Sequence, residues 1–132
     1  MAELCELLQA VGASAEASET PVLVAEYLRV FDRTSPCSPR EGSWTQQAVS
    51  GRPALIADIA GFYAAFGVQL GSALSDTEDR IAAELEFSAF LALKLAYAAA
   101  TGEQQGAEVV HAALRSFWCD HVGRFVLPFA RA

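Results

Sequence analysis

Basic residues are scarce in this sequence of 132 residues. Nine lysines and arginines stand against sixteen aspartates and glutamates, which gives a formal net charge of −7. No run of lysine or arginine occurs, so the phosphate backbone of a nucleic acid would be repelled. The composition therefore excludes nucleic acid as a partner and favours a cationic one.

Paired cysteines and a secretory signal are also lacking. The three cysteines, Cys5, Cys37 and Cys119, are odd in number and have neither Cys-x-x-Cys nor zinc-ligand spacing. We interpret them as reduced thiols of a cytoplasmic protein. Glu3 and Glu6 stand where a secretory signal would carry basic residues, so we expect no export of the protein itself.

No apolar run is long enough to span a membrane. The longest extends from Phe87 to Ala100, is interrupted by Ser88 and Lys94, and falls short of the roughly 20 residues that a bilayer requires. We predict a buried helix there. Apolar residues nevertheless make up 53% of the chain and charged residues only 19%, so part of the apolar surface is expected to face a partner.

Alternating patterns typical of strands are absent, and the length fits a single domain over residues 1–132. The apolar spacing predicts an all-α bundle of about five to six helices. Helices are expected at residues 4–11, 21–32, 53–67, 77–101 and 104–122. Asp76 or Thr77 is expected to cap the fourth helix, and Pro128 to stop the last.

The densest group of charges lies at the start of the most apolar helix. It consists of Asp76, Glu78, Asp79, Glu84 and Glu86. Asp79 and Glu86 are seven residues apart and are expected to share a helix face, whereas Glu84 lies on another side. An acidic rim beside an apolar groove suits a peptide with a basic head and an apolar body. A solvated, well-capped helix start is the alternative.

No motif indicates catalysis, since the sequence has no nucleophile elbow and no glycine-rich phosphate loop. Glu108 and His111 form one Glu-x-x-His, half of the motif of carboxylate-bridged di-iron bundles, and no second copy occurs. Cys119 and His121 are two residues apart on an expected helix and point in different directions. We therefore predict neither an enzyme nor a bound metal or other cofactor.

Trp44 stands in a polar connection between two expected helices, from Arg33 to Arg52. A large apolar side chain there must either fold back onto the body of the protein or contact a partner. We favour folding back.

Motifs that recur together in one family cover most of the chain. Tyr27 to Phe31 is similar to Tyr-x-Arg-Leu-Phe and is followed by a loop from Cys37 to Glu41. Ile56 to Gly67 ends in Phe-Tyr-x-x-Phe-Gly, and Ile81 to Phe87 is similar to Ile-Ala-x-Glu-Leu-Glu-Phe. Phe117, Asp120, His121 and a proline-containing end follow in the expected order. With these motifs the sequence resembles the TorD/DmsD/NarJ family of redox-enzyme maturation chaperones.

The sequence departs from that family in one loop and in length. The family's Glu-x-Pro-Asp-His loop corresponds here to Asp76, Glu78, Asp79 and Arg80, of which only Asp79 is retained. Members usually extend further at both ends. The chain therefore looks shortened, and it could complete its core by dimerisation or segment exchange.

The resemblance implies a cytoplasmic chaperone that binds the twin-arginine leader or the apoprotein of a molybdopterin oxidoreductase and assists cofactor insertion before export. The candidate client-binding residues are Tyr27, Phe31, Asp58, Asp76, Asp79, Glu84 and Glu86. Tyr27 and Phe31 would lie in a groove or the core, and Glu84 or Glu86 could instead brace neighbouring backbone. Two alternatives remain open: a generic helical module that dimerises through its apolar surface, and a helical metal-binding enzyme built around Glu108 and His111.

Overall fold

The computed structural model describes residues 9, 13–14, 16–31, 37–45, 51–71 and 77–132. It divides into two compact units, Met1–Cys37 and Ser38–Ala132. The predicted all-α class is confirmed, because the described residues form helices and the one β feature among them is an isolated bridge between Arg40 and Arg80. The grouping of both units into a single domain stays a prediction.

The first unit contains helix α2, Thr20–Phe31. Thr20 precedes Pro21, whose fixed φ angle suits the first turn of a helix, so the observed start agrees with the expected one. Tyr27 and Phe31 are one turn apart, and their ring centroids lie 5.1 Å from each other. The two aromatic candidates therefore share one face of α2.

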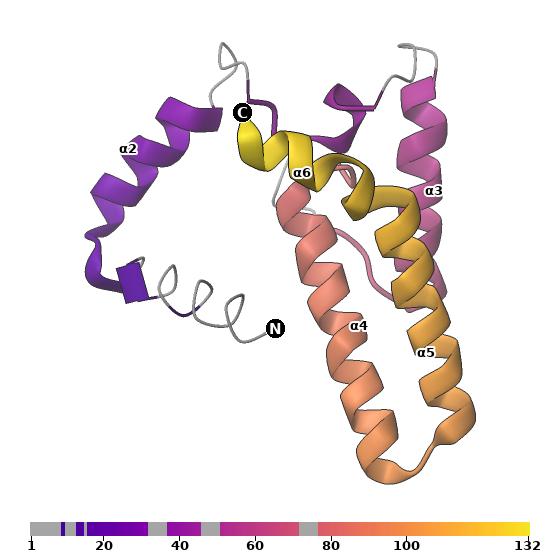
Figure 1. Cartoon of the computed structure of the whole chain (residues 1–132). Coiled ribbons are helices and arrows are strands. Elements are labelled where there is room, and N and C mark those ends of the chain that lie inside the picture. The colour runs from indigo at the N-terminus through magenta and orange to yellow at the C-terminus, as the bar shows by residue number, and fades with distance from the viewer. Residues whose placement is uncertain (1–8, 10–12, 15, 32–36, 46–50, 72–76) are drawn as a thin grey trace. The chain divides into compact units, whose positions relative to one another are not determined.

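The second unit holds the remaining helices. They are the short 3₁₀ helix η1 (Glu41–Ser43), α3 (Arg52–Ala65), α4 (Ile81–Thr101), α5 (Gln104–Phe117), the π-helical turn η3 (Trp118–Val122) and α6 (Gly123–Arg131). In Figure 1, α4 and α5 form a long antiparallel hairpin, and α6 continues from α5 at the end opposite the hairpin's turn. Within the described residues no helix is both long and apolar enough to cross a membrane.

Two glycines end helices as their sequence positions predict. Gly102 has a φ of 75° and turns the chain between α4 and α5, where Glu103 N–H donates to the Ala98 carbonyl at 2.9 Å. Gly67, with a φ of 70°, follows α3. Positive φ strains most L-residues, so glycine is the residue that permits both left-handed caps.

The core of the second unit forms where α3, α4 and α5 meet. Tyr63 of α3 and Phe117 of α5 both contact the Phe87 ring of α4, with centroid separations of 4.7 Å and 4.9 Å. The remaining buried members of this cluster are Leu55, Ile59, Leu91, Val110 and Val122. The aromatic stripes of the sequence are therefore core residues.

The structure corrects two predicted helix boundaries. Thr77 does not cap α4, because α4 begins at Ile81 after Arg80 in extended conformation. Asp76, the other predicted cap, lies outside the described residues. Pro128 does not stop the last helix but lies inside α6. Pro128 is exposed, so water can satisfy the carbonyl that loses its N–H partner.

Trp44 folds back, as favoured from the sequence. Its indole Nε1–H donates to the Ser38 carbonyl at 2.6 Å. Its ring meets the edge of Phe129 at a centroid separation of 6.0 Å. The connection that precedes α3 is thereby attached to α6.

Candidate functional site

Polar side chains gather where the loop of residues 38–45 meets the start of α4 and the turn η3. Glu41, Asp79, Glu84 and His121 are almost completely buried there. Burying ionisable groups is costly unless each finds a partner of opposite charge or a hydrogen bond. The partners of these four side chains therefore determine which of them are charged and which could contact a ligand.

Backbone hydrogen bonds fasten the loop to the segment before α4. Glu41 N–H donates to the Asp79 carbonyl at 2.8 Å, and Ile81 N–H donates to the Pro39 carbonyl at 2.9 Å. Gly42 makes this approach possible, because a Cβ there would lie 3.1 Å from Asp79 Oδ2. The loop and the α4 start form one structural unit through these contacts.

Asp79 is held by cations rather than left in solvent. Arg52 Nη2, at the start of α3, lies 3.4 Å from Asp79 Oδ2, and Arg40 Nη1 lies 3.9 Å from Oδ1. The Thr77 hydroxyl also donates to Asp79 Oδ1. Asp79 therefore contacts three segments of the chain: the loop with Arg40, the start of α3 and the residues before α4.

Glu84 has no such compensation. Neither carboxyl oxygen has a hydrogen-bond partner among the described residues. Burial, together with the negative charges of Glu41 and Asp79, raises the pKa of the Glu84 carboxyl to about 8. The group is therefore mainly protonated at neutral pH. Burial and the same acidic surroundings raise the pKa of Tyr63, whose hydroxyl donates to the Glu78 carbonyl at 3.1 Å.

His121 lies between two carboxylates. Its Nδ1 is 3.2 Å from Glu41 Oε2, and its Nε2 is 3.4 Å from Asp58 Oδ2. The imidazole packs against the rings of Phe62 and Phe117. Glu41 is buried behind the histidine, whereas the side chain of Asp58 is 67% exposed. The histidine thus links a buried carboxylate to a surface carboxylate.

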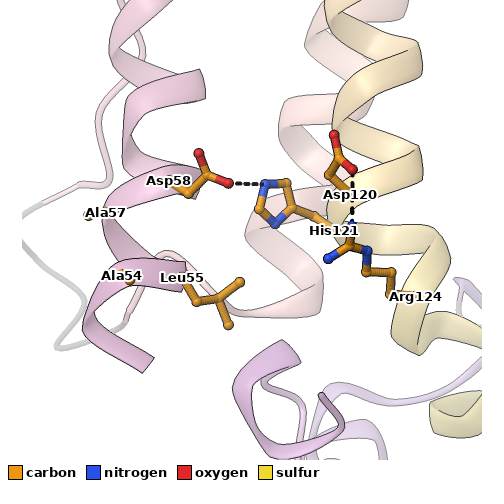
Figure 2. A pocket seen from close by; sticks show the side chains of 7 residues that line it. All are labelled: Ala54, Leu55, Ala57, Asp58, Asp120, His121 and Arg124. Atoms are coloured by element: carbon orange, nitrogen blue, oxygen red, sulfur yellow. Dashed lines mark hydrogen bonds and ion pairs between the residues drawn. The ribbon is translucent and has the colours of Figure 1, made fainter. Parts of the chain in front are cut away.

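The surface side of His121 opens into a pocket of about 670 Å³. Figure 2 shows Asp58 of α3 on one side of His121, and Asp120 and Arg124 on the other. Arg124 Nη2 and Asp120 Oδ1 are 3.1 Å apart. The apolar lining consists of Ala54, Leu55 and Ala57. The pocket combines a carboxylate, a buried imidazole and a short apolar wall.

A second, smaller pocket of about 230 Å³ is mainly apolar. Val68, Leu70, Phe87 and Phe90 contribute to its wall, and the exposed Glu86 stands beside them. The predicted combination of an acidic group with an apolar surface is present here in a reduced form. It involves Glu86 alone of the acidic residues along α4, because Glu84 is buried and Asp79 precedes the helix.

Within the second unit, the described site residues predicted from the sequence do not form one surface. Asp58 and Glu86 are exposed on different pockets, and Asp79 and Glu84 are buried. The expectation that Asp79 and Glu86 share a helix face is wrong, since Asp79 is not in α4. Tyr27 and Phe31 belong to the first unit, and Asp76 lies outside the described residues.

Sequence reasoning missed the pairing of Glu41 with His121 and the role of Arg52. Glu41 and His121 are 80 residues apart in the chain, so no local spacing connects them. Both residues do fall in motifs that the sequence shares with the chaperone family, and this was the available signal. Arg52 carried none.

Glu108 and His111 are both exposed on α5, and the Cys119 side chain is exposed and forms no disulfide. Among the described residues there is no cluster of three or more histidine, cysteine or acidic side chains with a geometry that could hold a metal ion.

The all-helical fold agrees with the family that the sequence resembles, and the comparison with family models identifies that family. The model described as "Nitrate reductase delta subunit" matches residues 1–131, so the chain belongs to this NarJ/TorD-like chaperone family. A perchlorate reductase assembly chaperone protein of Dechloromonas aromatica (strain RCB) is 39% identical over 77 residues. That alignment covers 56% of this chain and 34% of the relative. No solved structure matches.

Proposed function

We propose that the protein is a non-catalytic assembly chaperone of a molybdopterin oxidoreductase. It binds the twin-arginine leader or the apoprotein of its client in the cytoplasm and assists cofactor insertion before export. The observation that carries this proposal is the family match over residues 1–131. The name of the perchlorate reductase chaperone, to which the chain is similar, supports the same class of client.

The electrostatics of the chain support a basic client segment. A net charge of −7 attracts a cationic peptide over a distance of about one Debye length and raises its association rate. Asp58 is exposed on one pocket, and Glu86 stands beside an apolar pocket. Paired arginines followed by an apolar stretch are complementary to surfaces of these two kinds.

The candidate residues divide into two proposed roles. Asp58 and Glu86 are exposed and available to a client. Asp79 and Glu84 are buried, so we assign them to the shape of the site and not to direct contact. Tyr27 and Phe31 remain proposed groove residues of α2.

Isothermal calorimetry of the full chain with a twin-arginine leader peptide tests the proposal, with a twin-lysine peptide as control. Binding of the arginine peptide that weakens with added salt is expected, because exposed charge pairs are screened. The lysine peptide should bind less tightly, since lysine lacks the planar donor pair of arginine. Failure of the arginine peptide and of the leader-bearing apoprotein to bind would contradict the proposal.

A homodimerising module is the second candidate, favoured by apolar side chains on the outside of the hairpin. Leu93 and Tyr97 of α4 are 72% and 66% exposed, and Val109 of α5 is 60% exposed. Exposed apolar groups of this size are often covered by a partner. Sedimentation velocity distinguishes the candidates: a concentration-dependent dimer without leader affinity would favour the module.

A further inference from the structure

We infer that the loop of residues 38–45 is a pH-sensitive element, which opens away from the start of α4 when the buried Glu84 carboxyl releases its proton to solvent. In the closed state, which is the state of the structure, Glu84 is fully buried in the first turn of α4. The inference concerns contacts within the second unit and does not rest on the proposed function.

Glu84 is buried without a group that would stabilise its charge. Neither carboxyl oxygen has a hydrogen-bond partner among the described residues. Tyr63 of α3 faces the same region, but its hydroxyl donates to the Glu78 carbonyl. Burial and the nearby carboxylates raise the pKa of Tyr63, so it remains neutral and supplies no positive charge. An ionised carboxylate in this place would lose its hydration without compensation, so the closed state holds Glu84 in its neutral form.

The other groups that face Glu84 are two more buried carboxylates, Glu41 of the loop and Asp79 before α4. Each already has its own partner, since Glu41 lies 3.2 Å from His121 and Asp79 lies 3.4 Å from Arg52. Ionisation of Glu84 therefore adds a third negative charge to a buried group of carboxylates. The repulsion acts directly on the loop, because the loop carries Glu41.

The loop is the part of this region that can move at the lowest cost. Glu84 is fixed in α4, because Phe87 and Leu91 of the same helix belong to the core. The loop contributes no side chain to that core, and two backbone hydrogen bonds attach it to the segment that leads into α4. Water can replace those hydrogen bonds when the loop opens, whereas moving α4 would expose the core.

The pH dependence follows from the pKa of Glu84 in the two states. In the closed state, burial and the charges of Glu41 and Asp79 raise this pKa to about 8. In the open state water reaches the carboxyl, and its ordinary pKa of 4.5 applies. The open state therefore gives up its proton at lower pH than the closed state. Rising pH favours opening by about tenfold per pH unit between these two values, and the effect levels off above the higher one.

Opening of the loop also changes the pocket beside His121. Glu41 Oε2 is the buried carboxylate 3.2 Å from His121 Nδ1, and it leaves with the loop. His121 lines the pocket of about 670 Å³ and then retains only its contact with Asp58 (Figure 2). The charge and the shape of this pocket wall thus depend on the state of the loop.

Amide hydrogen exchange of the full chain, followed by NMR at pH 5, 6 and 7, tests the inference. The Glu41 and Ile81 amides report on the loop, because each donates across the contact between the loop and the segment that leads into α4. The Leu91 amide, in the middle of α4, reports on unfolding of the helix. After correction for the intrinsic pH dependence of exchange, the protection of Glu41 and Ile81 should be lower than that of Leu91 and should fall about tenfold per pH unit.

Two variants assign this fall to Glu84. Glu84→Gln removes the ionisable group, so the protection of Glu41 and Ile81 should no longer fall with pH. Glu86→Gln changes an exposed neighbour on the same helix, and its protection should fall as in the wild type.

Three results would each overturn the inference. They are protection that does not depend on pH in the wild type, the same fall in Glu84→Gln as in the wild type, and equal protection of Glu41, Ile81 and Leu91. The last result would mean that the loop opens only when the whole second unit unfolds. The first and the last are read from the wild type alone, so they decide the matter even where a variant fails to fold.

Discussion

Replacing Glu84 by glutamine should make the protein more stable at neutral pH. Glu84 is fully buried, and both carboxyl oxygens lack hydrogen-bond partners among the described residues. Its pKa is raised from 4.5 to about 8 in the folded protein. The folded state therefore keeps a proton that the unfolded chain releases above pH 4.5, so rising pH favours unfolding until the folded group also ionises.

The size of the effect follows from the two pKa values. Each pH unit between them costs about 1.4 kcal/mol, so the loss at pH 7 amounts to about 3 kcal/mol. Glutamine has nearly the same shape and no ionisable group, so it does not carry this pH-dependent cost. Glu84→Gln should therefore gain about 3 kcal/mol at pH 7 and less than about 1 kcal/mol at pH 5.

Urea unfolding of wild type and variant at pH 5, 6, 7 and 8 measures this difference. Glu86→Gln is the matched control, because Glu86 is an exposed neighbour on the same helix, and its effect should stay within about 0.5 kcal/mol. An equal stability difference for Glu84→Gln at pH 5 and pH 7, or a variant less stable than wild type at pH 7, would contradict a buried Glu84 that is protonated in the folded state.

Three further substitutions test the helices that position the site. Gly123→Ala should destabilise by about 1–3 kcal/mol, because its Cβ would lie 2.6 Å from the Trp118 carbonyl oxygen in the π-helical turn. Gly61→Ala in α3 meets no atom within 4 Å and should stabilise by about 0.5–1 kcal/mol. Arg52→Met leaves the buried Asp79 with its weaker partners and should cost about 2 kcal/mol. Thermal unfolding followed by circular dichroism measures all three, and a neutral Gly123→Ala would contradict the close contact in the turn.

Local signals were sufficient for most helices of the protein. Pro21, Gly67 and Gly102 act through their own backbone preferences, so the start of α2 and the ends of α3 and α4 could be predicted from single residues. The stretch from Trp118 to Val122 could not, since an inserted π-helical turn leaves no distinct spacing in a helical pattern. The predicted stop at Pro128 was wrong because the residue is exposed to solvent, which reduces the energetic cost of a proline inside a helix. The sequence does not reveal this exposure.

The polar site around Asp79 and His121 was harder to predict, because it forms through contacts between segments that are distant in the sequence. The acidic residues near the α4 start suggested either a solvated cap or a binding rim, because their spacing gives no information about what covers them. The loop that contains Glu41 forms backbone hydrogen bonds with Asp79 and Ile81, and Arg52 of α3 neutralises Asp79. Asp58 was named from the sequence, but its neighbour His121 came close only through the packing of α3 against η3.

The most direct test of the chaperone role is the molybdenum content of a reductase precursor produced with its twin-arginine leader, with and without this protein. The precursor is purified from both preparations, and metal per polypeptide is determined by mass spectrometry. We expect a higher molybdenum content in the presence of the protein. Equal content in both preparations, with no complex between the two proteins, would contradict an assembly role.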